Sequence, residues 1–63
     1  MNHYNITVRE SNGFRAYVHP FGESASCTWS EEEAVKNAAR RCFGSSLVSV
    51  KKKRAGLWVA TVR

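Results

Sequence analysis

The sequence predicts an α+β domain in which one helix packs on one face of a single antiparallel β-sheet of four to five strands. Two observations support this prediction. Several short segments alternate apolar and polar residues, as half-buried strands do, and only the segment between Ser30 and Gly44 has helical spacing. The expected order is strand, strand, strand, helix, strand, strand. The chain has 63 residues, so we expect residues 1–63 to form one domain.

The first part of the chain is predicted to be a β-hairpin. Segments 4–9 and 14–19 both alternate, and their inward-facing residues are expected to be Tyr4, Ile6, Val8, Phe14, Ala16 and Val18. Between them, Asn12-Gly13 supplies the positive φ angles that a tight connection needs. The second strand is expected to end before Pro20, because proline has no amide hydrogen to donate to a ladder.

A short third strand is expected to lead directly into the helix. In this segment Ala25, Cys27 and Trp29 alternate with serine and threonine, and we expect Trp29 to pack under the start of the helix. Cys27 and Cys42 lie on either side of the helix, about 18 Å apart at a rise of ~1.5 Å per residue. This separation is too large for an intrachain disulfide, so both thiols are expected to be reduced and buried.

The helix is predicted from its capping and charge pattern. Ser30 is a favourable N-cap, and Glu33 three residues later completes a capping box. Acidic residues at the start and arginines at the end complement the helix dipole, and Gly44 can take a left-handed conformation that stops the helix. The apolar stripe is narrow and rich in alanine, which allows close packing on a sheet: Val35, Ala38, Ala39 and Cys42.

A second hairpin is expected to complete the sheet. Segment 46–52 is predicted to place Val48 and Val50 on one face, and residues 53–56 are predicted to form the turn. In segment 57–63 both alternating sets are apolar, so the pattern leaves open which set faces the helix. We favour Leu57 and Val59 for the open face. One helix covers only one face of the sheet, so the other face is left to solvent or to a partner.

Net charge is the property of the sequence that bears most on function. Ten lysines and arginines stand against five glutamates and no aspartate, which gives a formal charge of +5 and favours a polyanionic partner. Basic residues are expected at the tip of the last hairpin and on the open sheet face. The predicted partner-binding residues are Arg9, Arg15, Tyr17, His19, Lys51, Lys52, Lys53, Arg54 and Trp58.

Two kinds of partner fit this set of residues. Basic groups beside an exposed aromatic ring suit phosphate contacts with base stacking, and they equally suit docking on an acidic protein surface. The alternative for Tyr17 and Trp58 is packing within the domain, and the alternative for the lysine run is a solvated hairpin tip.

No catalytic or metal-binding constellation is recognisable. The chain has no phosphate-binding glycine loop and no nucleophile elbow, and no aspartate is available to orient a histidine, so we expect no enzymatic activity. His3, His19, Cys27 and Cys42 lack the short spacing of zinc ligands, so no metal or other cofactor is expected. No apolar run is long enough to span a membrane, so we expect a cytoplasmic protein of a host cell with no membrane partner. Both a monomer and a homodimer are compatible with the sequence.

The residues Cys42-Phe43-Gly44 and Gly56-Leu57-Trp58, together with Ala60, give the second half of the chain a family resemblance. This half resembles a small phage-encoded anti-CRISPR protein family that inhibits type I-F surveillance complexes. The resemblance implies a non-enzymatic inhibitor that docks on the Cas7-type backbone of such a complex and blocks pairing of the guide with target DNA. Lysines near the last hairpin would make the contact.

We therefore expect a phage or mobile-element inhibitor that binds a host defence complex through a basic surface. The alternative is a direct nucleic-acid-binding module that uses the open sheet face and the hairpin tip. Residues 13–18 followed by 30–34 are also similar to antitoxin domains of the HicB type. That similarity extends only to local architecture, because the proline-glycine-cysteine turn of those domains and their separate DNA-binding domain are missing.

Overall fold

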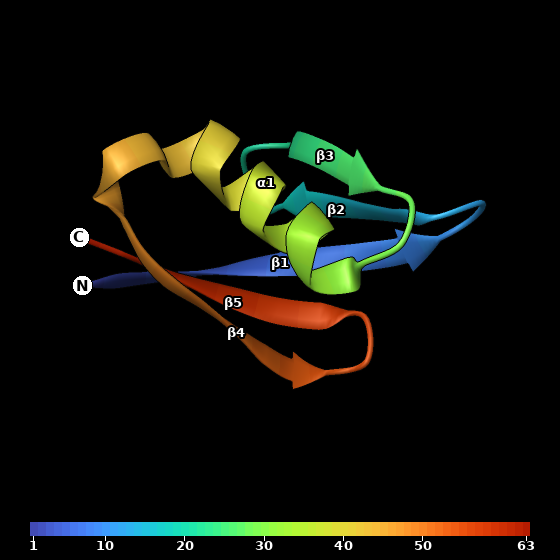
Figure 1. Ribbon diagram of the computed structural model, residues 1–63. Coiled ribbons are helices and arrows are strands. Elements are labelled where there is room, and N and C mark those ends of the chain that lie inside the picture. Colours follow the sequence, from blue (N-terminus) through green and yellow to red (C-terminus); the bar gives the residue numbers. More distant parts are fainter.

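Alternating apolar and polar residues produce five strands in one antiparallel sheet, and the amphipathic segment produces one α-helix beside it (Figure 1). The structure is a computed structural model that describes residues 1–63. Its elements are β1 (Asn2–Glu10), β2 (Phe14–Val18), β3 (Glu23–Cys27), α1 (Glu31–Phe43), a short 3₁₀ helix (Gly44–Ser46), β4 (Leu47–Arg54) and β5 (Leu57–Val62). The strand order is β3-β2-β1-β5-β4, which confirms the α+β prediction.

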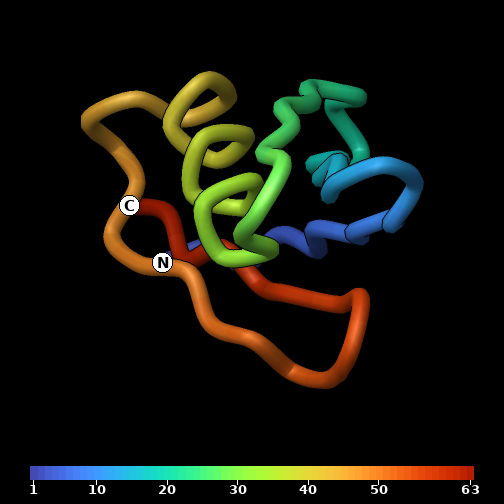
Figure 2. Tube along the Cα trace, turned by 45° about the vertical axis from the view of Figure 1, so that its right-hand side comes forward, coloured from blue at the N-terminus to red at the C-terminus, as the bar shows by residue number.

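The helix α1 lies across one side of the sheet, as Figures 1 and 2 show from two directions. Its fully buried residues include three of the predicted stripe, Val35, Ala38 and Ala39, whereas Cys42 is half-buried. The sheet buries six residues against the helix: Ile6, Ala16, Val18, Trp58, Ala60 and Val62. Five of the ten buried residues are alanines, three of them in the helix and two in the sheet, so the helix backbone approaches the sheet closely.

Both ends of α1 have the caps that the sequence predicts. The Ser30 hydroxyl accepts a hydrogen bond from the Glu33 backbone N–H at 3.2 Å, which is one of the two bonds of a capping box. Gly44 has a φ angle of 57°, and its N–H donates to the carbonyl of Arg40. These two caps fix the length of the helix.

The strand β5 resolves the choice that its sequence leaves open. Trp58 is opposite Ile6 in the β1–β5 register and lies in the core, with Ala60 and Val62 following on the same side. Leu57 and Val59 therefore point to the open face, as we favoured.

The expectation that Trp29 packs under the start of the helix is wrong. The strand β3 ends at Cys27, the chain bends at Thr28 and Trp29, and the Trp29 side chain is 86% exposed. The space beside the first helical turn is occupied by Trp58, whose indole Nε1 donates to Glu31 Oε2 at 2.6 Å.

Two expectations for β4 are also corrected. A shift in register between Leu47 and Ser49 interrupts the alternation, so Val48 is 45% exposed while Leu47 packs against the core with Val50. The run from Lys51 to Arg54 belongs to the strand itself, since only Ala55 and Gly56 form the turn. The basic run therefore lies along an edge strand.

An aromatic cluster, which sequence reasoning did not foresee, closes the core near the end of α1. The rings of Tyr4 and Phe43 are stacked with centroids 5.1 Å apart. Phe21 meets both edge-on, at 5.2 and 5.7 Å, although its side chain remains 56% exposed. The cluster holds the β2–β3 connection against the helix.

Candidate polyanion-binding face

The open face is the side of the sheet away from α1, and strand alternation determines which side chains project from it. Arg9 is directly opposite Arg15, and Thr7 is opposite Tyr17. On the other side of β1, Asn5 is opposite Val59, which is in turn opposite Lys51. The open face consists of His3, Asn5, Thr7, Arg9, Arg15, Tyr17, His19, Ser24, Ser26, Ser49, Lys51, Arg54, Leu57, Val59 and Thr61.

No carboxylate lies on the open face. Three of the five glutamates form the first turn of α1. Glu10 is opposite Phe14 and Glu23 is opposite Val18, and both of these partners face the helix. The strand period of two therefore directs Glu10 and Glu23 to the helix side, where the other three glutamates already lie in the helix itself.

The cations on the two sides differ in their partners. On the helix side, Lys36 contacts Glu32 at 2.8 Å, Arg41 contacts Glu23 at 3.7 Å and Lys52 contacts Glu31 at 3.6 Å. No salt bridge involves a cation of the open face. Because the neutralising groups are all on one side, the positive charge of the protein is concentrated on the other.

Two shallow hollows shape the open face. One, of about 610 Å³, lies over β1, β5 and β4 and is lined by His3, Asn5, Ser49, Lys51, Lys52, Lys53, Val59 and Thr61. The second, of about 270 Å³, is lined by Thr7, Arg9, Tyr17 and His19. Both are lined mainly by polar and basic groups, which suits an extended anionic partner better than an apolar small molecule.

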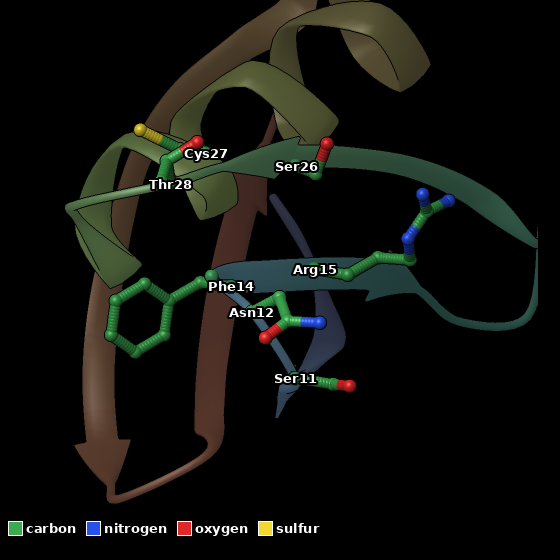
Figure 3. Close-up of a pocket in the computed structure, with 8 residues that line it drawn as sticks. Ser11, Asn12, Phe14, Arg15, Ser26, Cys27 and Thr28 are labelled. Atoms are coloured by element: carbon green, nitrogen blue, oxygen red, sulfur yellow. The ribbon is translucent and has the colours of Figure 1, made fainter.

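A third hollow, of about 150 Å³, lies between the β1–β2 connection and the end of β3 (Figure 3). Arg15 and Ser26 point to one side of the sheet there, whereas Phe14 and Cys27 point to the other. Arg15 is thus exposed at the border of the open face, next to the edge strand β3.

Each histidine shares a hydrogen bond with a threonine of a neighbouring strand. His19 Nε2 lies 2.8 Å from Thr7 Oγ1, and His3 Nδ1 lies 3.3 Å from Thr61 Oγ1. Neither imidazole forms an ion pair with a carboxylate. The structure also contains no group of three or more histidine, cysteine or acidic side chains that could hold a metal ion.

The structure brings most of the predicted partner-binding residues to one side. Arg9, Arg15, Tyr17, His19, Lys51 and Arg54 lie on the open face, and Lys53 lines its larger hollow. Lys52 also lines this hollow, but its ammonium group extends to Glu31 on the helix side. Trp58 is in the core and only 8% exposed, because it shares its side of β5 with Ala60 and Val62, so it does not belong to the open face.

Sequence reasoning missed several polar members of this face. Asn5 and Thr7 have the same parity as Arg9 along β1, and Ser49 and Thr61 lie opposite one another on β4 and β5. Asn5 and Thr7 could have been identified from the sequence, because they are four and two residues before Arg9 on the same strand and therefore share its face. The last two required the register between strands, which the sequence does not contain.

No helix of the structure has the length and apolar character to cross a membrane. The chain matches no protein-family model, no curated protein and no solved structure. Its function is therefore inferred from the geometry and charge of the open face.

Proposed function

We propose that the protein is a non-enzymatic binding module whose open face contacts the phosphate backbone of a nucleic acid. The observation that carries this proposal is the separation of charge: the open face has lysine and arginine side chains and no carboxylate. Phosphate contacts made by such a face release condensed counterions, which supplies most of the free energy of sequence-independent binding.

The cations of the face form two groups, one on β1 and β2 and the other on the edge strand β4. Arg9 and Arg15 form a cross-strand pair on β1 and β2, whereas Lys51 and Arg54 project from β4. The strands β2 and β4 are separated by three strand spacings, roughly 14 Å at ~4.8 Å per spacing. A single strand of nucleic acid lying across the sheet would place phosphates at both groups of cations. Its bases would rest on the half-buried Leu57 and Val59 between these groups and on Tyr17 beside Arg15.

The proposal predicts a steep dependence of binding on salt. Fluorescence anisotropy with labelled single-stranded DNA and RNA should show log K falling with log salt by roughly 0.7 for each phosphate neutralised. Arg15→Gln should weaken binding and lower this slope by about 0.7, since one contact is lost. Arg40→Gln is the matched control, because Arg40 is an exposed arginine on the helix side. Salt-independent binding, or equal effects of the two variants, would refute the proposal.

A second candidate function is inhibition of a host defence complex by docking on one of its proteins. The observation that favours it is the run of exposed cations on β4, at the end of a hairpin that extends past the helix (Figures 1 and 2): Lys51, Lys52, Lys53 and Arg54. An acidic protein surface would complement this edge. The anti-CRISPR resemblance implies that this protein would inhibit the binding of target DNA by a type I-F complex.

One experiment separates these two functions. The tagged protein is used to capture partners from cells that carry a type I-F CRISPR-Cas system, with and without nuclease treatment. Nucleic acid that is lost after nuclease, with no stoichiometric protein, supports direct binding by the open face. A stoichiometric protein that survives nuclease and is lost in Lys51→Glu with Lys53→Glu supports the inhibitor.

A further inference from the structure

The edge strand β3 carries backbone hydrogen-bonding groups with no partner in the chain. The His19 N–H donates to the Asn5 carbonyl at 2.9 Å, so the backbone groups of Arg15 and Tyr17, which have the same parity, also point to β1. Those of Ala16 therefore point to β3, where they meet Ala25. The N–H and C=O groups of Ser24 and Ser26, which alternate with Ala25, are directed to the free edge.

The two edges of the sheet differ in how they resist pairing with another strand. The edge strand β4 has register shifts at both ends and four consecutive cations, which disfavour pairing with a second copy of itself. The edge strand β3 has neither feature. Its central residues are small and uncharged, Ser24-Ala25-Ser26, and its pairing with β2 is regular.

We propose that β3 pairs with β3 of a second copy of this chain, antiparallel and centred on Ala25, to form a two-fold dimer. In this register Ser24 of one copy is opposite Ser26 of the other. Both residues direct their backbone groups to the edge, so the two pairs exchange four hydrogen bonds. All the free edge groups of Ser24 and Ser26 in both copies are then used.

Two exposed aromatic residues are at equal separations along the sequence from Ala25, the centre of this register. Phe21 precedes Ala25 by four residues and Trp29 follows it by four, and their side chains are 56% and 86% exposed. The two-fold axis brings Trp29 of one copy to the same end of the interface as Phe21 of the other. Phe21 keeps its contacts with Tyr4 and Phe43, so burial of the Trp29 ring against the exposed part of Phe21 would add apolar area at both ends of an otherwise polar contact.

The dimer also joins the two open faces. A two-fold axis perpendicular to the sheet keeps both helices on one side and both open faces on the other. The sheet then has ten strands and a width of roughly 43 Å, compared with roughly 19 Å for one copy, at ~4.8 Å per strand spacing. Arg15, at the border of one copy, becomes part of the centre of the combined face.

The test is the mass in solution, measured by sedimentation equilibrium over a range of concentrations. The wild-type chain should reach twice the mass of the 7.1 kDa monomer. Ser26→Pro removes an edge-directed N–H without removing a bond to β2, so this variant should stay folded by circular dichroism and become monomeric. Ser26→Ala keeps the N–H and is the matched control, which should remain dimeric.

A wild-type chain that stays monomeric at every concentration would overturn the proposal, and so would a Ser26→Pro variant that still dimerises. If Ser26→Pro fails to fold, amide hydrogen exchange of the wild-type chain decides instead. Exchange at Ser24 and Ser26 that slows as concentration rises supports pairing of β3, and exchange independent of concentration excludes it. Dimerisation and nucleic-acid binding are measured separately, so either proposal can fail without the other.

Discussion

The indole Nε1 of Trp58 donates a hydrogen bond to Glu31 Oε2 at 2.6 Å, and the other carboxylate oxygen of Glu31 lies 3.6 Å from the ammonium group of Lys52. The carboxylate of Glu31 in the first turn of α1 therefore contacts side chains of both β4 and β5. This arrangement fixes the start of the helix above β5. Trp58 and Lys52 are opposite one another in the β4–β5 register, so both are on the helix side of the sheet, where Glu31 lies.

Trp58→Phe should destabilise the fold by about 1–3 kcal/mol, because it removes a charge-assisted hydrogen bond and reduces the buried volume. Chemical denaturation followed by circular dichroism measures this loss. Glu32→Gln is a suitable comparison, because it removes only an exposed i,i+4 pair with Lys36 and should cost much less stability than Trp58→Phe. Equal losses in the two variants would mean that the bond from Trp58 to Glu31 contributes little.

Lys52→Glu should lower stability, whereas Lys53→Glu should leave it nearly unchanged. The first variant places a second carboxylate beside Glu31, and the second changes an exposed residue that has no ion pair. Because Lys52 is half exposed, the expected loss is about 1 kcal/mol or less, and it should shrink as salt is added. Thermal denaturation of both variants at low and high salt tests this contrast. A larger loss for Lys53→Glu would contradict the assignment of these two side chains.

Gly13→Ala should destabilise the protein more than Gly22→Ala. Both glycines have positive φ, 123° and 77° respectively. A Cβ atom at residue 13 would also lie 3.1 Å from the Thr28 Cα and 3.2 Å from the Cys27 carbonyl oxygen, whereas no atom lies within 4 Å of one at residue 22. We expect about 1–3 kcal/mol of strain at either site, with an added steric cost only at residue 13. Denaturant midpoints of the two variants provide the comparison.

The pKa of the Cys42 thiol is raised above its usual 9.0, mainly by burial and secondly by the negative charge of Glu23. In a Cys27→Ser background, Cys42 should therefore be alkylated by iodoacetamide more slowly than the same thiol in the unfolded chain. Its protonated form also favours the folded state. That contribution to stability is present below pH 9.0 and is lost as the pH rises through the raised pKa. Equal alkylation rates in the folded and unfolded chains would contradict this prediction.

Local patterns predicted those parts of the fold that depend on neighbouring residues. The caps at Ser30 and Gly44, the Asn12-Gly13 connection and the inward sets of β1 and β2 each require only a few adjacent residues, and all are present. The sequence did not contain the register of β4 on β5. A shift there exposes Val48, and no local signal marks it.

The open face was predictable where the alternation of residues within one strand determines the direction of a side chain. The parity of Arg9, Arg15 and Tyr17 could be read directly from their strands. Trp29 and Trp58 could not be assigned that way, because both alternate with polar or ambiguous neighbours and compete for the space beside the first helical turn. Only the three-dimensional structure shows that Trp58 occupies it and that Trp29 stays exposed.

The central strand of the sheet comes from one end of the chain, and its partner β5 comes from the other. During synthesis, β1 can therefore pair with β2 early, but its second edge is covered only when β5 has been made. The helix likewise lacks Trp58, Ala60 and Val62 beneath it until that point. Because β4 pairs only with β5, a chain that lacked β5 would lose the pairing of two strands at once, so the sheet is expected to be completed only after β5 has been synthesised.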